Sequence, residues 1–360
     1  MELSRILIGA MRFKDRPAAV ATVRAAIDAG FNYIDCSPCY CYRSEEENSE
    51  RWVGEAINHP DYRDRVMVSA KCSPGNGGWE LGEFSKAKGF GVRTADQLRQ
   101  VFDQSRNRIG VDRFDYYHLW TTHTKEQLDE TLKPGGWYEG LRSVKDKWGR
   151  LGITTHADGG TIISFLESGK FEIVTIPFNV VNTTRREVVD YCNKKGIVVI
   201  AMNPFAGGFL ATHERLRDLS LRYLLSLEGV HPLIGFSSVS EVDYAAKILD
   251  EMPAGGYNAD EILDEVNDLI NTDEPRCTAC GYCQPCPEGI NVGACLSYYN
   301  IYKYMHMAEA KEAFNKKQWE DGLRLDRCKY CGTCKLRCPN HLDVVAIIKD
   351  ARRMMYEKKS

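Results

Sequence analysis

The chain of 360 residues lacks long apolar runs and clustered charge. No window approaches the roughly 18 apolar residues that a helix needs to cross a bilayer, and residues 1–5 hold no apolar signal core. Lys and Arg are scattered, and the net charge of −3 favours no polyanionic partner. We therefore expect a cytoplasmic protein that binds neither membrane nor nucleic acid.

The sequence also lacks a G-x-G-x-x-G turn after its first apolar run, and a doubly wound dinucleotide-binding sheet would need that turn. Up to about residue 250, short apolar runs alternate with helical patterns at intervals of about thirty residues, which is typical of a parallel sheet. The eight runs are Arg5–Gly9, Phe31–Asp35, Val66–Lys71, Phe114–Leu119, Leu151–Thr154, Ile173–Pro177, Ile197–Met202 and Pro232–Gly235. Eight such units predict an α/β fold, a (β/α)8 TIM barrel.

Proline and glycine punctuate the chain just after residue 252, where the barrel pattern ends. An amphipathic helix is predicted from Asn258 to Ile270, and the last helix from Val344 to Tyr356. We therefore place the barrel at residues 1–252, a linker with a connecting helix at 253–274, and a small, mostly helical domain at 275–360.

Eight of the fourteen cysteines lie in two C-terminal runs. The runs are Cys277, Cys280, Cys283 and Cys286 before Pro287, and Cys328, Cys331, Cys334 and Cys338 before Pro339. The second run has the Cys-x2-Cys-x2-Cys-x3-Cys-Pro spacing of bacterial two-cluster ferredoxins, and the first is one residue shorter before its last cysteine. The sequence therefore predicts two 4Fe-4S clusters in a ferredoxin-like domain.

In such ferredoxins the fourth cysteine of a run ligates the other cluster. This rule gives one cluster Cys277, Cys280, Cys283 and Cys338, and the other Cys328, Cys331, Cys334 and Cys286. Zinc is the alternative, because paired Cys-x2-Cys motifs also build tetrahedral zinc sites. Zinc would leave the extra cysteine and the proline of each run unexplained. Either metal fits a reducing compartment better than a disulfide framework does.

Polar side chains at the ends of barrel strands are the first candidates for chemistry, because strand ends feed the active-site face. Asp35 ends the second run, Tyr40 lies just beyond it, and Lys71 ends the third. In the contexts Phe31-Asn32-Tyr33-Ile34-Asp35 and Ser69-Ala70-Lys71, these residues resemble the aldo-keto reductases. The resemblance extends through residues 152–156, 202–208 and 234–238. With the C-terminal cysteines, the chain resembles the branch that carries a fused 4Fe-4S dicluster domain.

The resemblance implies that a small carbonyl or alcohol is the substrate, with Tyr40 as proton donor, Lys71 as the cation beside it and Asp35 as the anion that holds Lys71. A carbonyl that accepts a hydride develops oxyanion charge and needs such a donor. The phenol has an ordinary pKa of about 10, so a cation is expected to lower it.

One catalytic position departs from the family's pattern. Where the family has a histidine at the end of strand four, this chain has Trp120, whose indole can only donate a hydrogen bond. Side chains alternate along a strand, so His118 is expected to point into the barrel like Trp120, one layer deeper. His123 lies on the loop that follows. Either histidine also fits an ordinary role, in the core for His118 and on a solvated loop for His123.

For NADP(H) or NAD(H), the resemblance implies contacts from four segments. These contacts are Thr155, His156, Thr175 in place of a common glutamine, Asn203, Gly207, Gly208, Gly235, Ser237 and Ser238. The pair that usually holds adenine is replaced by Tyr244-Ala245, and no Arg or Lys stands between Ile234 and Ala246 for a 2′-phosphate. We therefore expect that a nicotinamide can bind, but that the residues for tight binding of NADP are missing.

Four more cysteines, Cys36, Cys39, Cys41 and Cys72, flank Tyr40 and Lys71. They suit a metal or a redox pair, or they are small side chains tolerated in a reducing compartment. The segments Ser73–Val92, which contains Trp79, and Pro134–Trp137 are rich in glycine and tryptophan, and we expect a substrate lid there.

Three functions remain open at this stage. In the first, a nicotinamide delivers hydride to a carbonyl that Tyr40 protonates. In the second, the clusters pass single electrons, which come from a ferredoxin- or flavodoxin-like partner, to a substrate in the barrel. In the third, the barrel is a scaffold for an electron-transfer domain and has no substrate of its own.

Overall fold

The computed structural model describes residues 1–73, 92–270, 276–277, 281–317, 322–338 and 340–356. Eight parallel strands form a closed barrel in which each strand pairs with the next and β8 pairs with β1. The strands are β1 (Leu7–Gly9), β2 (Tyr33–Asp35), β3 (Met67–Cys72), β4 (Phe114–Trp120), β5 (Trp148–Thr154), β6 (Ile173–Pro177), β7 (Val198–Met202) and β8 (Val230–Ile234). The predicted (β/α)8 barrel is thus confirmed.

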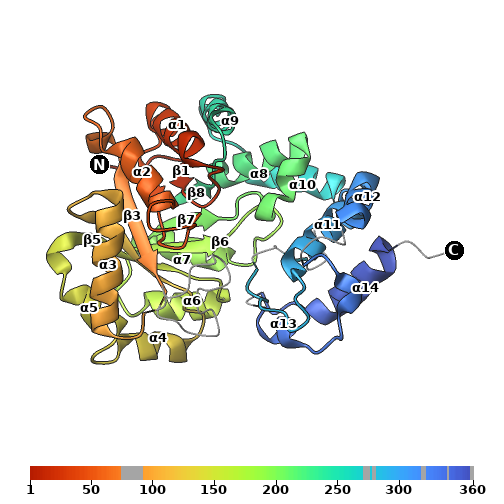
Figure 1. The fold of residues 1–360 in the computed structure, drawn as a ribbon. Helices are drawn as coiled ribbons and strands as arrows, with labels where there is room; N and C mark the ends of the chain where they lie inside the picture. The colour runs from red at the N-terminus through yellow and green to blue at the C-terminus, as the bar shows by residue number, and fades with distance from the viewer. Residues whose placement is uncertain (74–91, 271–275, 278–280, 318–321, 339, 357–360) are drawn as a thin grey trace. The chain divides into compact units, whose positions relative to one another are not determined.

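Helices alternate with the strands along the chain (Figure 1). They are α1 (Arg16–Asp28), α2 (Ser49–Ile57), α3 (Ala95–Ile109), α4 (Lys125–Leu132), α5 (Trp137–Arg142), α6 (Gly159–Leu166), α7 (Arg186–Lys195), α8 (Glu214–Ser226) and α9 (Val239–Asp250). Local signals set their ends: α3 begins with a reciprocal capping box between Thr94 and Gln97 and ends at Gly110 in the left-handed conformation.

Apolar side chains from six strands fill the barrel interior. The layer consists of Leu7, Tyr33, Met67, Tyr116, Ile173 and Ile200. The rings of Tyr33 and Tyr116 meet edge to face with their centroids 5.3 Å apart. This packed layer closes the interior, as expected of an eight-stranded barrel, so chemistry is confined to the strand ends.

The chain forms two compact units. The first comprises residues 1–178, 183–204 and 224–257, and the second comprises residues 179–182, 205–223 and 258–360. The second unit therefore includes a segment that follows β7 in addition to the cysteine-rich region. The boundaries predicted from the sequence, at residues 252 and 275, remain a prediction.

The second unit is mostly helical, as predicted (Figure 1). It holds α10 (Ala259–Leu269), α11 (Val292–Tyr304), α12 (Ala308–Lys317), α13 (Thr333–Leu336) and α14 (Val344–Met355). Phe314 of α12 packs edge to face on Tyr356, just after α14, with ring centroids 5.5 Å apart. None of the helices found among the described residues is both long and apolar enough to cross a membrane.

Candidate active site and iron–sulfur centre

A buried ion pair lies at the ends of β2 and β3. Lys71 Nζ donates a hydrogen bond to Asp35 Oδ2, and the two residues are only 2% and 3% exposed. A buried charge is tolerated when an opposite charge compensates its lost hydration. Burial raises the pKa of Asp35, and the Lys71 charge opposes that rise. The pairing that the sequence predicted is present in the structure.

Tyr40 and Trp120 complete a cluster around this pair. Lys71 Nζ lies 4.8 Å from the ring centroid of Tyr40 and 5.9 Å from that of Trp120. The two rings meet edge to face with centroids 6.3 Å apart. Ammonium groups at such distances are attracted to aromatic rings. The four predicted catalytic residues thus share one site at the ends of β2, β3 and β4.

The pKa of Tyr40 differs from the sequence expectation. It is raised well above its ordinary value, first by burial and then by the neighbouring Asp35 charge. Tyr40 is therefore protonated at neutral pH, which a proton donor requires.

Arg12 is the site residue that sequence reasoning missed. It lies on the loop between β1 and α1, and its charge lowers the pKa of Tyr40 in part. A Cβ atom on Gly235 would stand 2.7 Å from Arg12 Cγ, so only glycine leaves room for this side chain. The signal in the sequence was its place after the first strand, where barrel loops reach the active-site face.

Neither nearby histidine replaces the one that the family usually has. His118 is fully buried, its Nε2 lies 3.2 Å from the Tyr33 hydroxyl, and its Nδ1 lies 3.3 Å from Thr154 Oγ1. Burial lowers the pKa of His118 to about 3 and that of His123 to about 4. Both are therefore neutral at physiological pH, and His118 is a hydrogen-bonded core residue.

The predicted carboxamide contacts are engaged by groups of the chain itself. Thr155 Oγ1 donates to Thr122 O at 2.6 Å and accepts from Ala157 N at 3.1 Å. The Arg185 guanidinium donates to the backbone oxygens of His156 and Ala157 at 2.7 and 2.8 Å. A hydroxyl has a single donor hydrogen, so Thr155 has none left for a carboxamide oxygen in this arrangement.

A carboxylate occupies the predicted phosphate end of the nicotinamide site. Ser237 N and Ser237 Oγ donate to the two carboxylate oxygens of Glu241, at 2.6 and 2.8 Å. Glu241 lies in the first turn of α9, where backbone N–H groups favour an anion, and Ser238 is the N-cap residue. The place of a 2′-phosphate stays a prediction; at these residues it would meet the negative charge of Glu241.

The other predicted cofactor contacts do not form one described site. Thr175 is buried in β6, where its carbonyl accepts a hydrogen bond from Thr155 N at 3.0 Å. Asn203 belongs to the first unit, whereas Gly207 and Gly208 belong to the second. Their roles therefore stay predictions.

The four cysteines around Tyr40 make separate contacts. Cys72 accepts a hydrogen bond from the Trp137 indole at 3.0 Å, Cys39 lies 3.3 Å from Ser37 Oγ, and Cys41 donates to backbone carbonyls. Burial raises the pKa of Cys39 to about 11 and that of Cys72 to about 12, so both remain thiols. Within the described residues, no three His, Cys, Asp or Glu side chains converge on one single metal ion, and this finding covers the cysteines around Tyr40.

The lid expectation for the segment that ends at Trp137 stays a prediction. This side chain is buried in the first turn of α5, where it packs near Tyr117. Trp79 and residues 74–91 of the other predicted lid segment lie outside the described residues.

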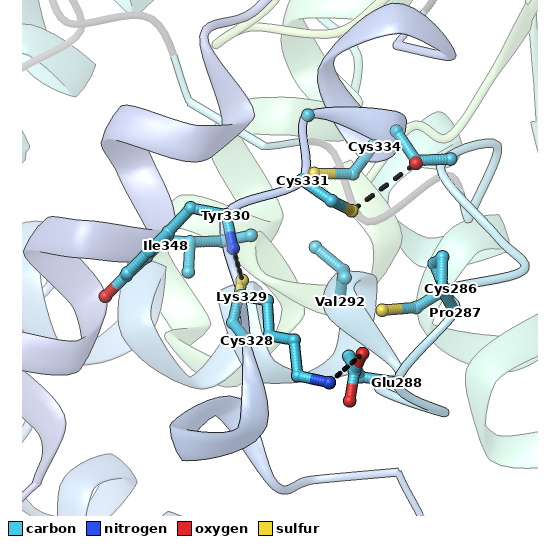
Figure 2. Close-up of a pocket in the computed structure, with 12 residues that line it drawn as sticks. Cys286, Pro287, Glu288, Val292, Cys328, Lys329, Tyr330, Cys331, Cys334 and Ile348 are labelled. Atoms are coloured by element: carbon cyan, nitrogen blue, oxygen red, sulfur yellow. Dashed lines mark hydrogen bonds and ion pairs between the residues drawn. The ribbon is translucent and has the colours of Figure 1, made fainter.

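In the second unit, four cysteines line one cavity. Figure 2 shows Cys286 on one side, and Cys328, Cys331 and Cys334 around the other. These are the four thiols that the crossover rule gave to one cluster. Thiolates that bind different irons of a cubane surround a volume in this way, so the residues present fit a 4Fe-4S group.

Hydrogen bonds and ion pairs hold the two runs together at this cavity. Lys329 forms an ion pair with Glu288 at 3.0 Å, and Arg337 donates to Pro285 O at 3.1 Å. Tyr330 N donates to Cys328 Sγ at 3.4 Å, a contact of the kind that tunes cluster potential. For the other predicted set, Cys280 lies outside the described residues, so the ligands Cys277, Cys280, Cys283 and Cys338 stay a prediction.

Comparison with known proteins identifies the family. The aldo/keto reductase family model matches residues 5–218. The chain belongs to the aldo/keto reductase family. A 4Fe-4S dicluster domain model matches residues 276–343, which contain both cysteine runs, so this family member carries a fused iron–sulfur domain.

Curated relatives agree that the chain is an oxidoreductase. An L-galactose dehydrogenase of Arabidopsis thaliana is 25% identical over 289 residues, which span 70% of this chain and 84% of the relative. Aflatoxin B1 aldehyde reductase member 2 of Mus musculus is 24% identical over 213 residues, spanning 58% of this chain and 53% of the relative. This second match leaves nearly half of the mouse protein uncovered.

Solved structures share the barrel fold. An aldo-keto reductase from Bacillus halodurans, in its holo form, has a TM-score of 0.59 and 17% identity, with 74% of this chain and 92% of that chain covered. An aldo-keto reductase from Klebsiella pneumoniae in complex with NADPH has a TM-score of 0.55 and 20% identity, with 74% and 91% covered. At these identities the likeness shows the fold alone.

Proposed function

We propose that this aldo/keto reductase reduces a small organic carbonyl compound, or oxidises the corresponding alcohol, with Tyr40 as the proton donor. The observation that carries the proposal is the cluster of Tyr40, Lys71, Asp35 and Trp120 at the strand ends of the barrel. A protonated phenol beside a buried ion pair is suited to an oxygen that gains negative charge.

The reduction adds two electrons and two protons to the carbonyl; Tyr40 supplies the proton on oxygen, and in the one-electron route the proton on carbon would come from solvent water. The Tyr40 hydroxyl gives its proton to the carbonyl oxygen as charge develops there. Lys71 is held by Asp35 and supplies a fixed positive charge next to the phenol, so little reorganisation is needed during the reaction. Trp120 forms an apolar wall beside the ring of Tyr40.

For the electrons, we propose that the iron–sulfur domain is the source. When bound, 4Fe-4S clusters supply electrons one at a time. Cys286, Cys328, Cys331 and Cys334 would hold one of two clusters, which is supported by their common cavity. Glu241 at the phosphate position argues against NADPH as the donor.

Nicotinamide-driven reduction is the second candidate, and family membership favours it. The Klebsiella pneumoniae relative was solved with NADPH. A nicotinamide without the 2′-phosphate would avoid the clash of charges at Glu241, so NAD(H) suits this chain better than NADP(H). A third reading, an electron-transfer scaffold without a substrate, predicts that the barrel residues have no catalytic effect.

The test uses the full chain, purified without oxygen and loaded with iron and sulfide. A panel of aldehydes and ketones is offered with three reductants in turn: chemically reduced clusters, NADH and NADPH. Tyr40→Phe is compared with Tyr42→Phe, a matched control whose hydroxyl donates to Glu45. We expect Tyr40→Phe to lower kcat by about 10²–10⁴-fold and Tyr42→Phe to change it little.

Equal turnover by Tyr40→Phe and the wild-type protein would remove Tyr40 from the mechanism. The reductants separate the two electron sources. Turnover with reduced clusters alone supports the iron–sulfur route, whereas turnover only after NADH or NADPH addition, with micromolar binding of the nucleotide, supports hydride transfer.

A further inference from the structure

Two exposed apolar side chains lie next to the cysteines that line the cavity. Leu336 on α13 is 87% exposed and stands two residues after Cys334. Tyr330 is 37% exposed and stands between Cys328 and Cys331. A leucine this exposed is not stabilised by the fold, and contact with another molecule would remove it from water.

Basic side chains surround these two residues. Lys349 Nζ lies 5.4 Å from the ring centroid of Tyr330, and Arg352 donates to the Tyr330 hydroxyl at 2.7 Å. Lys329 lines the cavity beside Tyr330, and Lys335 precedes Leu336 on α13. Together with Arg337, these residues define a basic patch: Lys329, Tyr330, Lys335, Leu336, Arg337, Lys349 and Arg352.

The patch keeps a surplus of positive charge. Lys329 is paired with Glu288 at 3.0 Å, and Lys335 with Asp343 at 2.8 Å. In the part of the chain that the structure describes, Arg337, Lys349 and Arg352 have no carboxylate partner and instead contact backbone oxygens or Tyr330. The chain as a whole carries a net charge of −3, so this local excess is opposite in sign to the rest of the protein.

We propose that the basic patch is the docking surface for an acidic one-electron carrier protein. The proposal rests on the proposed function in one respect, that the module holds clusters that exchange single electrons. Complementary charge steers two proteins into a productive encounter, and an exposed apolar residue at the centre then gives the contact its short-range affinity. Leu336 is suited to be that anchor, and the five cations are suited to an acidic face.

The test measures binding, not turnover. The iron-loaded full chain is titrated without oxygen with a purified acidic bacterial ferredoxin, by calorimetry, at about 50 and about 300 mM salt. Leu336→Asp and Lys349→Glu are compared with Lys125→Glu, a matched charge reversal on the barrel helix α4. Cytochrome c, a basic one-electron carrier, and vesicles rich in anionic lipid are the contrasting probes.

We expect Kd for the ferredoxin to rise about tenfold for each patch variant, to rise with salt in the wild-type protein, and to stay unchanged in Lys125→Glu. Unaltered Kd in both patch variants, absence of ferredoxin binding, or equal binding of cytochrome c would overturn the proposal. Preferential binding to the anionic vesicles would also overturn it, because the patch would then face a lipid surface.

The result can be separated from the fate of the proposed function. Iron content and the visible spectrum of each variant show whether the clusters are present before any titration. If no carbonyl compound reacts but ferredoxin binding depends on the patch, the carbonyl substrate is refuted and the docking surface is supported. If carbonyl compounds react but ferredoxin binding is the same in the patch variants, the docking surface is refuted and the carbonyl substrate is supported.

Discussion

Replacing Lys71 by methionine should destabilise the barrel strongly. Methionine fills a similar volume but leaves Asp35, which is 3% exposed, without its cation. Removing one partner of a buried ion pair typically costs about 3–5 kcal/mol, because the remaining charge is buried without compensation. For a domain of this size, about 1 kcal/mol corresponds to roughly 2–4 °C in Tm. Lys71→Met should therefore lower Tm by about 6–20 °C.

The loss of Tm in Lys71→Met should be larger at high pH than at low pH. Burial raises the pKa of Asp35 in the folded protein, and Lys71 opposes the rise, so the pKa is raised further when Lys71 is removed. A carboxyl whose pKa is higher in the folded than in the unfolded state stabilises the fold most below the unfolded pKa, and it loses that contribution as pH rises through the folded pKa. The gap between Lys71→Met and the wild-type protein should therefore be smaller near pH 5 than near pH 8.

The assay is thermal unfolding of the barrel followed by near-ultraviolet circular dichroism at both pH values. The double variant Lys71→Met/Asp35→Asn removes both charges and should recover more than half of the lost Tm. A Tm deficit that is the same at both pH values, or a double variant no more stable than Lys71→Met, would refute the idea that an uncompensated carboxylate causes the loss. Turnover should stay low in both variants, because neither keeps the cation beside Tyr40.

Three further predictions address other sites. Cys334→Ala should lower the iron content from about eight to about four atoms per chain, and Cys286→Ala should alter the same cluster by electron paramagnetic resonance; a full iron complement in either would contradict the ligand assignment. Glu241→Gln should tighten NADPH binding relative to NADH in a fluorescence titration, because the negative charge at Ser237 is removed; an unchanged ratio would place the phosphate elsewhere. Trp137→Phe should cost about 1 kcal/mol of unfolding free energy, the net value of one buried hydrogen bond, while leaving KM unchanged; a raised KM would support its role as a lid.

The barrel was predictable because its signals are local. Each strand is a short apolar run, and the final predicted helix, Val344 to Tyr356, differs from α14 by one residue because Asp343 caps its start and its apolar spacing is regular. The pairing of Lys71 with Asp35 was predictable too, since neighbouring parallel strands bring their ends together at one face.

Contacts between distant loops were not predictable. Arg12 packs against Gly235 only because the closed barrel places β1 beside β8, and nothing in either segment marks the contact. Orientation was equally hidden: the sequence placed Lys71 near Tyr40 but could not show that its ammonium lies over the ring. Trp137 was expected on a lid because glycines precede it, whereas its indole N–H has a buried partner in Cys72.

The departures from the family's pattern mainly affect the predicted nicotinamide contacts and not the residues for proton delivery. Residues that handle the proton and its charge, Tyr40, Lys71 and Asp35, are assembled in the barrel. Two of the positions predicted to receive a nicotinamide make hydrogen bonds within the chain: the Thr155 hydroxyl hydrogen goes to a backbone oxygen, and Ser237 N donates to the Glu241 carboxylate. A reductase fed one electron at a time needs the first set and not the second, because proton delivery is required whatever the electron source. In our proposal, the same chain that lacks a fitting NADP site therefore supplies the alternative in its iron–sulfur domain.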